Sequence, residues 1–65
     1  MRNTIKLTDE KVKGHRIITS LVKESGMYLI EITDTTDCRN PVSLFTSKLM
    51  DKGTANVTYK AITKG

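Results

Sequence analysis

The sequence predicts a mainly β protein in which about five strands form a small antiparallel sheet or barrel built on two hairpins. The densest apolar stretch, residues 17–33, is broken once by a polar segment that ends in Gly26. Residues 42–63 repeat this layout around Gly53. Apolar residues alternate with polar ones through much of both stretches, as they do in half-buried strands. The expected strands are 3–7, 15–23, 27–33, 42–50 and 54–63, within a single domain covering residues 1–65.

The first expected strand is short. Ile5 and Leu7 alternate with polar residues and are predicted to point inward. Residues 8–14 are charged and turn-like, so we expect them to lead from this strand into the first hairpin.

The first hairpin is predicted from a loop of three residues, Glu24-Ser25-Gly26, in which glycine takes a positive φ without steric cost. Lys23 and Met27 would then flank the loop. Antiparallel pairing from that point places six residues on one face, which is apolar apart from one serine. They are Ile18, Ser20, Val22, Tyr28, Ile30 and Ile32.

A helix over residues 9–25 is the alternative for the first half of this region. Thr8 would be its N-cap and Gly26 its C-cap. Gly14 in its interior and the β-branched run at 17–19 argue against it, because both lower helix propensity. The hairpin is therefore preferred.

The second hairpin follows a loop that contains no apolar residue before Pro41, apart from the single cysteine. Asp51-Lys52-Gly53 is predicted to reverse the chain as the first loop does, and a shift of 27 residues superposes the two glycines. The inner face would be apolar apart from one serine. Its residues are Phe45, Ser47, Leu49, Ala55, Val57 and Tyr59. The outer face would be polar and basic, with Lys48, Asn56 and Lys60 exposed.

An α+β alternative places a helix at residues 41–51. Asn40 would be the N-cap, Pro41 the first helical residue and Gly53 the stop signal. We favour the strand narrowly, and the protein is mainly β in either case.

Length and composition limit the core. A chain of 65 residues buries only about 60% of the surface that its unfolded form exposes, so a second copy often supplies further burial and a homodimer is possible. Cys38 is the only cysteine and excludes an internal disulfide, which favours a cytoplasmic location. The N-terminus has no apolar signal core and no run is long enough to span a membrane, so no membrane partner is expected.

The net charge of +4 is unevenly distributed along the chain. Residues 1–16 carry +3 and residues 39–65 carry +4, whereas residues 17–38 carry −3. A basic balance favours acidic partners, nucleic acid foremost. The competing interpretation is a solvated surface that only keeps a small protein soluble.

Catalytic and metal-binding patterns are not found in the sequence. It contains no nucleophile elbow, phosphate-binding glycine loop or paired metal-ligand spacing. Cys38 and His15 have the chemistry of a nucleophile and a base, but no local motif orients them. Glu31, Asp34 and Asp37 lack the loop pattern of a calcium site and are expected to be hydrated. We therefore expect a non-enzymatic protein without cofactor or metal.

The predicted function is nucleic-acid binding through an exposed β surface. Lysine, asparagine and threonine on such a surface can contact phosphates and base edges. The residues predicted to contact nucleic acid or another partner are Lys13, Arg16, Lys48, Asn56 and Lys60. The alternative is a small protein-interaction factor, such as an inhibitor or accessory protein encoded by a phage or mobile element, which binds through a free strand edge.

Overall fold

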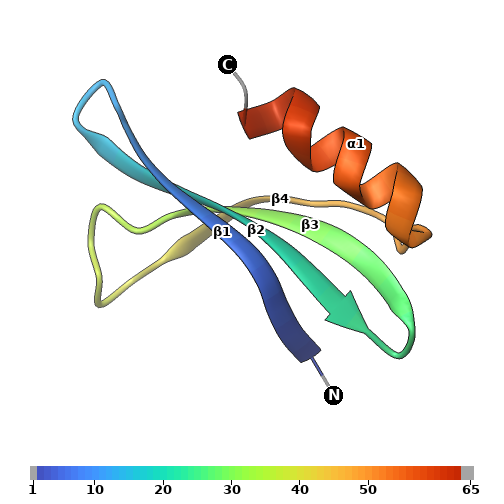
Figure 1. Ribbon diagram of the computed structural model, residues 1–65. Coiled ribbons are helices and arrows are strands. Elements are labelled where there is room, and N and C mark those ends of the chain that lie inside the picture. Colours follow the sequence, from blue (N-terminus) through green and yellow to red (C-terminus); the bar gives the residue numbers. More distant parts are fainter. Residues whose placement is uncertain (1, 64–65) are drawn as a thin grey trace.

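The computed structural model describes residues 2–63, which form a four-stranded antiparallel sheet followed by one helix (Figure 1). In chain order the elements are β1 (Arg2–Val12), β2 (His15–Glu24), β3 (Met27–Asp34), β4 (Val42–Thr46) and α1 (Lys52–Thr63). The strands lie side by side in the same order as in the sequence. The helix lies over one face of the twisted sheet. The prediction of a mainly β protein with a small antiparallel sheet is confirmed.

Two tight turns connect the first three strands. Val12 pairs with His15 and Glu24 pairs with Met27, so each connection is two residues long. Both residues of the second connection have positive φ, 51° at Ser25 and 81° at Gly26. The first connection, Lys13 and Gly14, has the same conformation. Such turns match the right-handed twist of the strands they join, which explains why this hairpin geometry is preferred.

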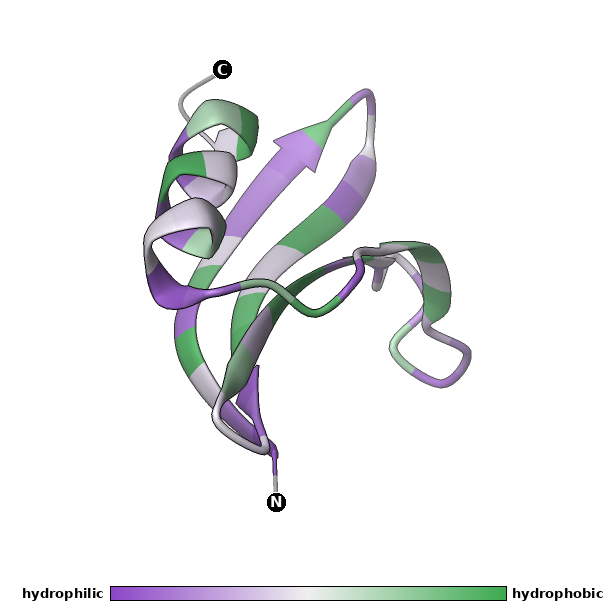
Figure 2. Ribbon diagram, turned by 90° about the vertical axis from the view of Figure 1, so that its right-hand side faces the viewer, coloured by the Kyte–Doolittle hydropathy of each residue, from purple (hydrophilic) through white to green (hydrophobic). Residues whose placement is uncertain are grey.

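The predicted register of the first hairpin is wrong by one residue. Glu24 belongs to β2 rather than to a three-residue loop, so Leu21 rather than Ser20 lies opposite Ile30. A slip of one residue moves every side chain of a strand to the other face of the sheet. The predicted apolar face is therefore divided: Ile30 lies on the helix side of the sheet opposite Leu21, whereas Val22 lies on the other side opposite Leu29. Figure 2 shows the alternation of polar and apolar residues along the strands.

The first strand is longer than predicted. It extends through residues 8–12, which include three charged residues and were expected to form a turn, and it pairs with β2 up to Val12. Charged residues are tolerated here because β1 is an edge strand and nearly all its side chains are exposed. A register shift between Thr4 and Lys6 marks a β-bulge. The alternative helix over residues 9–25 is wrong, since this region forms β1 and β2.

The strand predicted at residues 42–50 is only partly regular. β4 ends at Thr46, but the following residues continue alongside β3: Ser47 N donates to Ile30 O, and Met50 forms an isolated bridge with Tyr28. The alternative helix at 41–51 is wrong because this segment pairs with β3.

The strand predicted at 54–63 is wrong, because residues 52–63 form α1. Asp51 caps the helix. Its carboxylate accepts hydrogen bonds from Thr54 Oγ1 at 2.5 Å and Thr54 N at 3.4 Å, and its backbone oxygen accepts from Ala55 N. An N-cap of this kind satisfies amide groups that have no partner within the helix. Gly53 therefore belongs to the first helical turn and does not reverse the chain, so the predicted equivalence of Gly26 and Gly53 is wrong.

Polar side chains in α1 bond to its own backbone. Thr58 and Thr63 donate their hydroxyl hydrogens to the carbonyl oxygens of the residues four positions earlier, and Asn56 Nδ2 donates to Lys52 O. These bonds satisfy residues that otherwise favour turns or strands. Packing against the sheet then outweighs the strand propensity of the helix's threonines, valine and isoleucine.

The core lies between α1 and the two central strands. Leu21 and Ile30 from the sheet pack against Ala55 and Tyr59 from the helix, with Tyr28 and Met50 at the margin. Ala55 and Tyr59 are four residues apart and so lie on the same side of the helix. The Tyr59 hydroxyl lies 2.5 Å from Thr8 Oγ1 and 3.5 Å from Thr19 O, which ties the helix to β1 and β2.

Within residues 2–63, no helix covers the other face of the sheet, yet Val22 and Leu29 are buried there. Arg2 on β1 forms an ion pair with Glu31 on β3, with Arg2 Nη2 2.7 Å from Glu31 Oε1. Because β2 lies between these strands, the arginine side chain must cross over β2 near Val22. Beside Glu31, the pKa of Arg2 is raised, mainly by their hydrogen bond. The long arginine side chain therefore shields apolar side chains that have no second layer above them.

Candidate nucleic-acid interface

Two lysines of the sheet lie on the face that carries the helix. Lys6 pairs with Leu21, and Lys23 pairs with Tyr28. Directly opposed residues of an antiparallel pair point to the same face. Leu21 and Tyr28 pack in the core beneath the helix, so Lys6 and Lys23 are on the helix side. Lys23 Nζ also lies 5.9 Å from the centre of the Tyr28 ring, within the range of a cation–π contact.

The helix contributes a polar flank with basic residues. Lys52, Asn56 and Lys60 are spaced four residues apart, which aligns them along one flank. The hydrogen bond from Asn56 Nδ2 to Lys52 O, at 3.0 Å, fixes the amide at the middle of this row. The helix contains no acidic residue between 52 and 63.

This flank faces β1 and β2. Thr58 Oγ1 lies 3.9 Å from the Met50 sulfur. Met50 forms a bridge with Tyr28 and lies on the same side of β3 as β4 does. A helix turns by about 100° per residue. Seen from the inward-facing Ala55, Asn56 and Thr58 therefore lie on opposite flanks of the helix. The contact of Tyr59 with Thr8 of β1 agrees with this orientation.

Together these residues form a surface that we call the basic band: Lys6, Lys23, Lys52, Asn56 and Lys60. Within residues 2–63, none of its four lysines forms an ion pair. Arg2 and Arg16, by contrast, have their charges opposed by carboxylates on the other face of the sheet. The positive charge of the band is therefore directed to solvent and is available to an external anion.

The five sequence-predicted residues are not all brought together. Asn56 and Lys60 lie in the basic band, on the helix rather than on the outer face of a hairpin, and that part of the prediction is corrected. Lys48 is exposed in the segment just before the helix. Lys13 lies in the β1–β2 turn, at the other end of β2 from Lys23. Arg16 points to the opposite face, where Nε and Nη2 bond to Asp9 at 2.6 to 3.2 Å.

Three members of the band were missed from the sequence. The four-residue spacing of Lys52, Asn56 and Lys60 was a usable signal, but it is meaningful only on a helix. Lys6 and Lys23 gave no such signal, because their face depends on the bulge in β1 and on the length of the β2–β3 turn.

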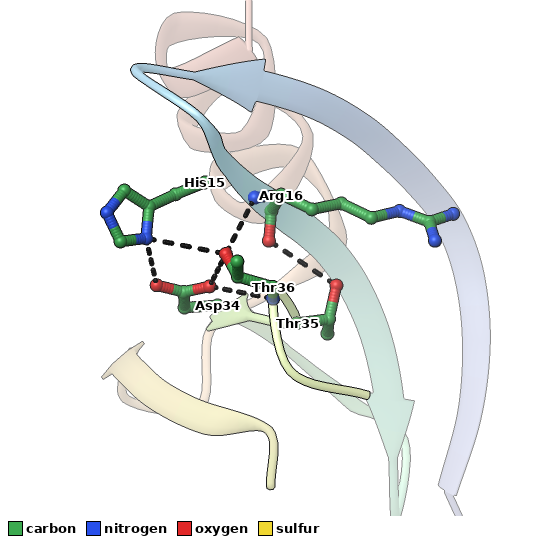
Figure 3. Close-up of polar contacts among 5 residues, drawn as sticks. All are labelled: His15, Arg16, Asp34, Thr35 and Thr36. Carbon is green, nitrogen blue, oxygen red and sulfur yellow. Dashed lines mark hydrogen bonds and ion pairs between the residues drawn. The ribbon is translucent and has the colours of Figure 1, made fainter. Parts of the chain in front are cut away.

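A second polar cluster connects the start of β2 to the loop after β3 (Figure 3). His15 Nδ1 lies 3.1 Å from Asp34 Oδ2. Thr36 donates its hydroxyl and amide hydrogens to Asp34 Oδ1, at 2.5 and 2.9 Å. Arg16 N donates to Thr36 Oγ1, and Thr35 N donates to Arg16 O. The cluster therefore fastens the loop that leads to β4.

The chemistry of this cluster is structural. Hydrogen bonds from the hydroxyl and the amide of Thr36 hold the pKa of Asp34 below its usual range, so the carboxylate stays ionised. Cys38 is exposed in the same loop. In the part of the chain from 2 to 63, no pocket is found and no three His, Cys, Asp or Glu side chains are grouped so as to hold a metal ion.

Comparisons with protein-family models, curated proteins and solved structures gave no match to this chain. In the described residues, no helix has the length and apolar character needed to cross a membrane.

Proposed function

We propose that this chain is a non-enzymatic module that binds nucleic acid through the basic band. The observation that carries this proposal is the convergence of four lysines from β1, β2 and α1 on one side of the molecule, with no acidic partner among the described residues. A nucleic-acid backbone presents regularly spaced negative charges, and lysines that neutralise phosphates release condensed counterions.

Contacts to the backbone rather than to stacked bases dominate this binding. Tyr59 is buried in the core, and the Tyr28 ring lies under the side chain of Lys23. Neither tyrosine ring offers the free aromatic face on which single-stranded bases stack, and the exposed Phe45 lies on β4, at the opposite edge of the sheet from Lys6 of the band. Asn56 is the one amide in the band, and its contribution is a hydrogen bond to phosphate, sugar or a base edge. We therefore expect little sequence preference and a strong dependence on salt.

The test is fluorescence anisotropy with labelled duplex and single-stranded DNA and RNA, repeated over a range of salt concentrations. The wild type is compared with a Lys52→Gln/Lys60→Gln double variant. The matched control is Lys11→Gln/Lys13→Gln, which loses the same charge at the other end of β2. Each lost phosphate contact should reduce the slope of log affinity against log salt by about 0.7 to 0.9.

We expect the band variant to bind more weakly with a shallower salt slope, and the control to bind nearly as the wild type does. Equal losses in both variants would mean that only net charge matters, and would contradict a localised site. No binding at low salt to any of the four nucleic acids would reject the proposal.

A protein-interaction factor is the second candidate. It is favoured by large apolar side chains that are exposed on both edge strands, among them Leu7 on β1 and Leu44 on β4. Affinity capture from a lysate treated with nuclease separates the two candidates, because only a protein partner survives that treatment. A specific protein retained by the wild type and lost on Leu44→Lys would support it, and retention of no protein would remove it.

A further inference from the structure

The outer edge of the sheet at β4 is exposed and uncharged. Every residue from Val42 to Thr46 is exposed, with Val42, Leu44 and Phe45 at 56, 55 and 47%. No charged residue occurs between Asn40 and Lys48. β4 pairs with β3 on one side only, so its other side presents backbone N–H and C=O groups that no described strand of this chain meets. Such an edge is a template for pairing with another strand.

The opposite edge is protected. β1 carries charged side chains along its length, including Lys6, Asp9 and Lys11, and a bulge interrupts it between Thr4 and Lys6. Charges and bulges are the usual devices that prevent two sheets from joining at their edges. β4 has a bulge between Ser43 and Phe45 but no charge. Only one of the two edges is therefore open to pairing.

We infer that β4 pairs with β4 of a second copy, antiparallel and about a twofold axis that is perpendicular to the sheet and passes beside Leu44, the middle residue of the strand. An uncharged strand meets no like charge when it pairs with itself, and the same patch serves both copies in a twofold interface. The chain also needs further burial. In residues 2–63 only six hydrophobic residues are buried, whereas ten large ones are exposed. A second copy is the one partner that is always present in equal amount.

This pairing also brings the two Phe45 side chains close to each other. Phe45 pairs with Ile32, and Ile32 pairs with Thr19, so Phe45 lies on the helix face of the sheet. A twofold axis at β4 brings the two Phe45 side chains to the same face beside the axis. The joined sheet has eight strands, with four from each copy. Both helices and both basic bands then lie on one side of it.

The test is molar mass in solution, measured by sedimentation equilibrium or light scattering from micromolar to near-millimolar concentration without nucleic acid. The wild type should approach twice 7.3 kDa. Leu44→Lys should remain monomeric, because two lysines are then brought together at the axis. Leu7→Lys is the matched control at the other edge, where Leu7 is 57% exposed, and it should dimerise like the wild type.

A wild type that stays monomeric over this range overturns the inference, as does equal dissociation of the Leu44 and Leu7 variants. A larger, open-ended assembly also overturns it, since twofold pairing at one edge closes at two copies. If the Leu44 variant fails to fold, amide exchange of the wild type decides: β4 amides should exchange more slowly as concentration rises. If the exchange of the β4 amides does not depend on concentration, or if these amides are protected only when a different protein is added, β4 does not pair with a second copy. Because nucleic acid is absent, these results do not depend on the proposed function.

Discussion

Residues 24–26 and 51–53 are two polar segments that end in glycine, and each lies between two stretches that contain apolar residues. Their backbone conformations nevertheless differ. Gly26 has a φ of 81° and joins two antiparallel strands. Gly53 lies in the first turn of a helix. The difference comes from the neighbouring residues. Asp51 caps the helix through Thr54, and Ala55 and Tyr59 have helical spacing, whereas the residues around Gly26 alternate as in strands.

The comparison shows that a glycine permits a tight turn but does not require one. At Gly26 the conformation is local, because only glycine enters the left-handed region without cost. At Gly53 the conformation depends on a capping carboxylate and on distant packing. The hairpin and the helix should therefore respond differently to substitution, and four experiments test that difference.

The largest effect is expected at the anchor of the helix. Tyr59→Ala removes a buried aromatic ring from the contact between α1 and the sheet, and should lower the free energy of unfolding by about 3 to 5 kcal/mol. Tyr59→Phe keeps the ring and loses only the hydroxyl contacts to Thr8 and Thr19, at about 1 kcal/mol. Urea denaturation measures both. Equal costs would show that the hydroxyl, not the packing, holds the helix.

Gly26→Ala should destabilise the hairpin. A Cβ at this position meets no atom within 4 Å, so the cost comes from the positive φ alone. An L-residue in the left-handed region loses about 1 to 2 kcal/mol relative to glycine. Chemical denaturation measures the loss, and an unchanged midpoint would show that the turn has moved to another conformation.

Gly53→Ala should have the opposite sign. The added Cβ would lie 3.4 Å from Asp51 Oδ2, which is ordinary van der Waals contact, and the helical φ suits alanine. Alanine gains up to about 1 kcal/mol over glycine in a helix, and less near its end. The two glycine variants together test the comparison. Destabilisation by both would mean that residues 51–53 need glycine for a reason other than helix formation.

The smallest effect concerns pH. Hydrogen bonds from Thr54 hold the pKa of Asp51 below its usual value. The stabilisation that follows is present above the unfolded pKa of the carboxyl group and is lost as pH falls through its lower folded pKa. Asp51→Asn keeps a capping side chain but cannot titrate, so its unfolding midpoint should depend less on acid pH than that of the wild type. Identical pH profiles would contradict the assigned cap.

Most of the sheet could be predicted because its signals are local. Alternation and turn residues place β2 and β3 within one residue of their bounds. The same sequence around Gly26 fits a loop of two residues or of three. The choice between these loop lengths decides which face of the sheet each side chain occupies. The helix could not be predicted with the same certainty, because its threonines and valine favour strands and only packing on Leu21 and Ile30 outweighs them. The basic band depends both on the length of the β2–β3 loop and on the formation of the helix. For this reason the sequence predicted only two of its members, Asn56 and Lys60.

The chain-order arrangement of the strands has a consequence for folding kinetics. Each strand pairs with its neighbour in sequence, and two of the three connections need only two residues, so the entropy lost on closing these loops is small. The contact of Tyr59 with Thr8 spans 51 residues, which makes docking of the helix the most non-local event in the chain. We therefore expect the hairpins to form early, and substitutions in the helix to accelerate unfolding more than they slow folding.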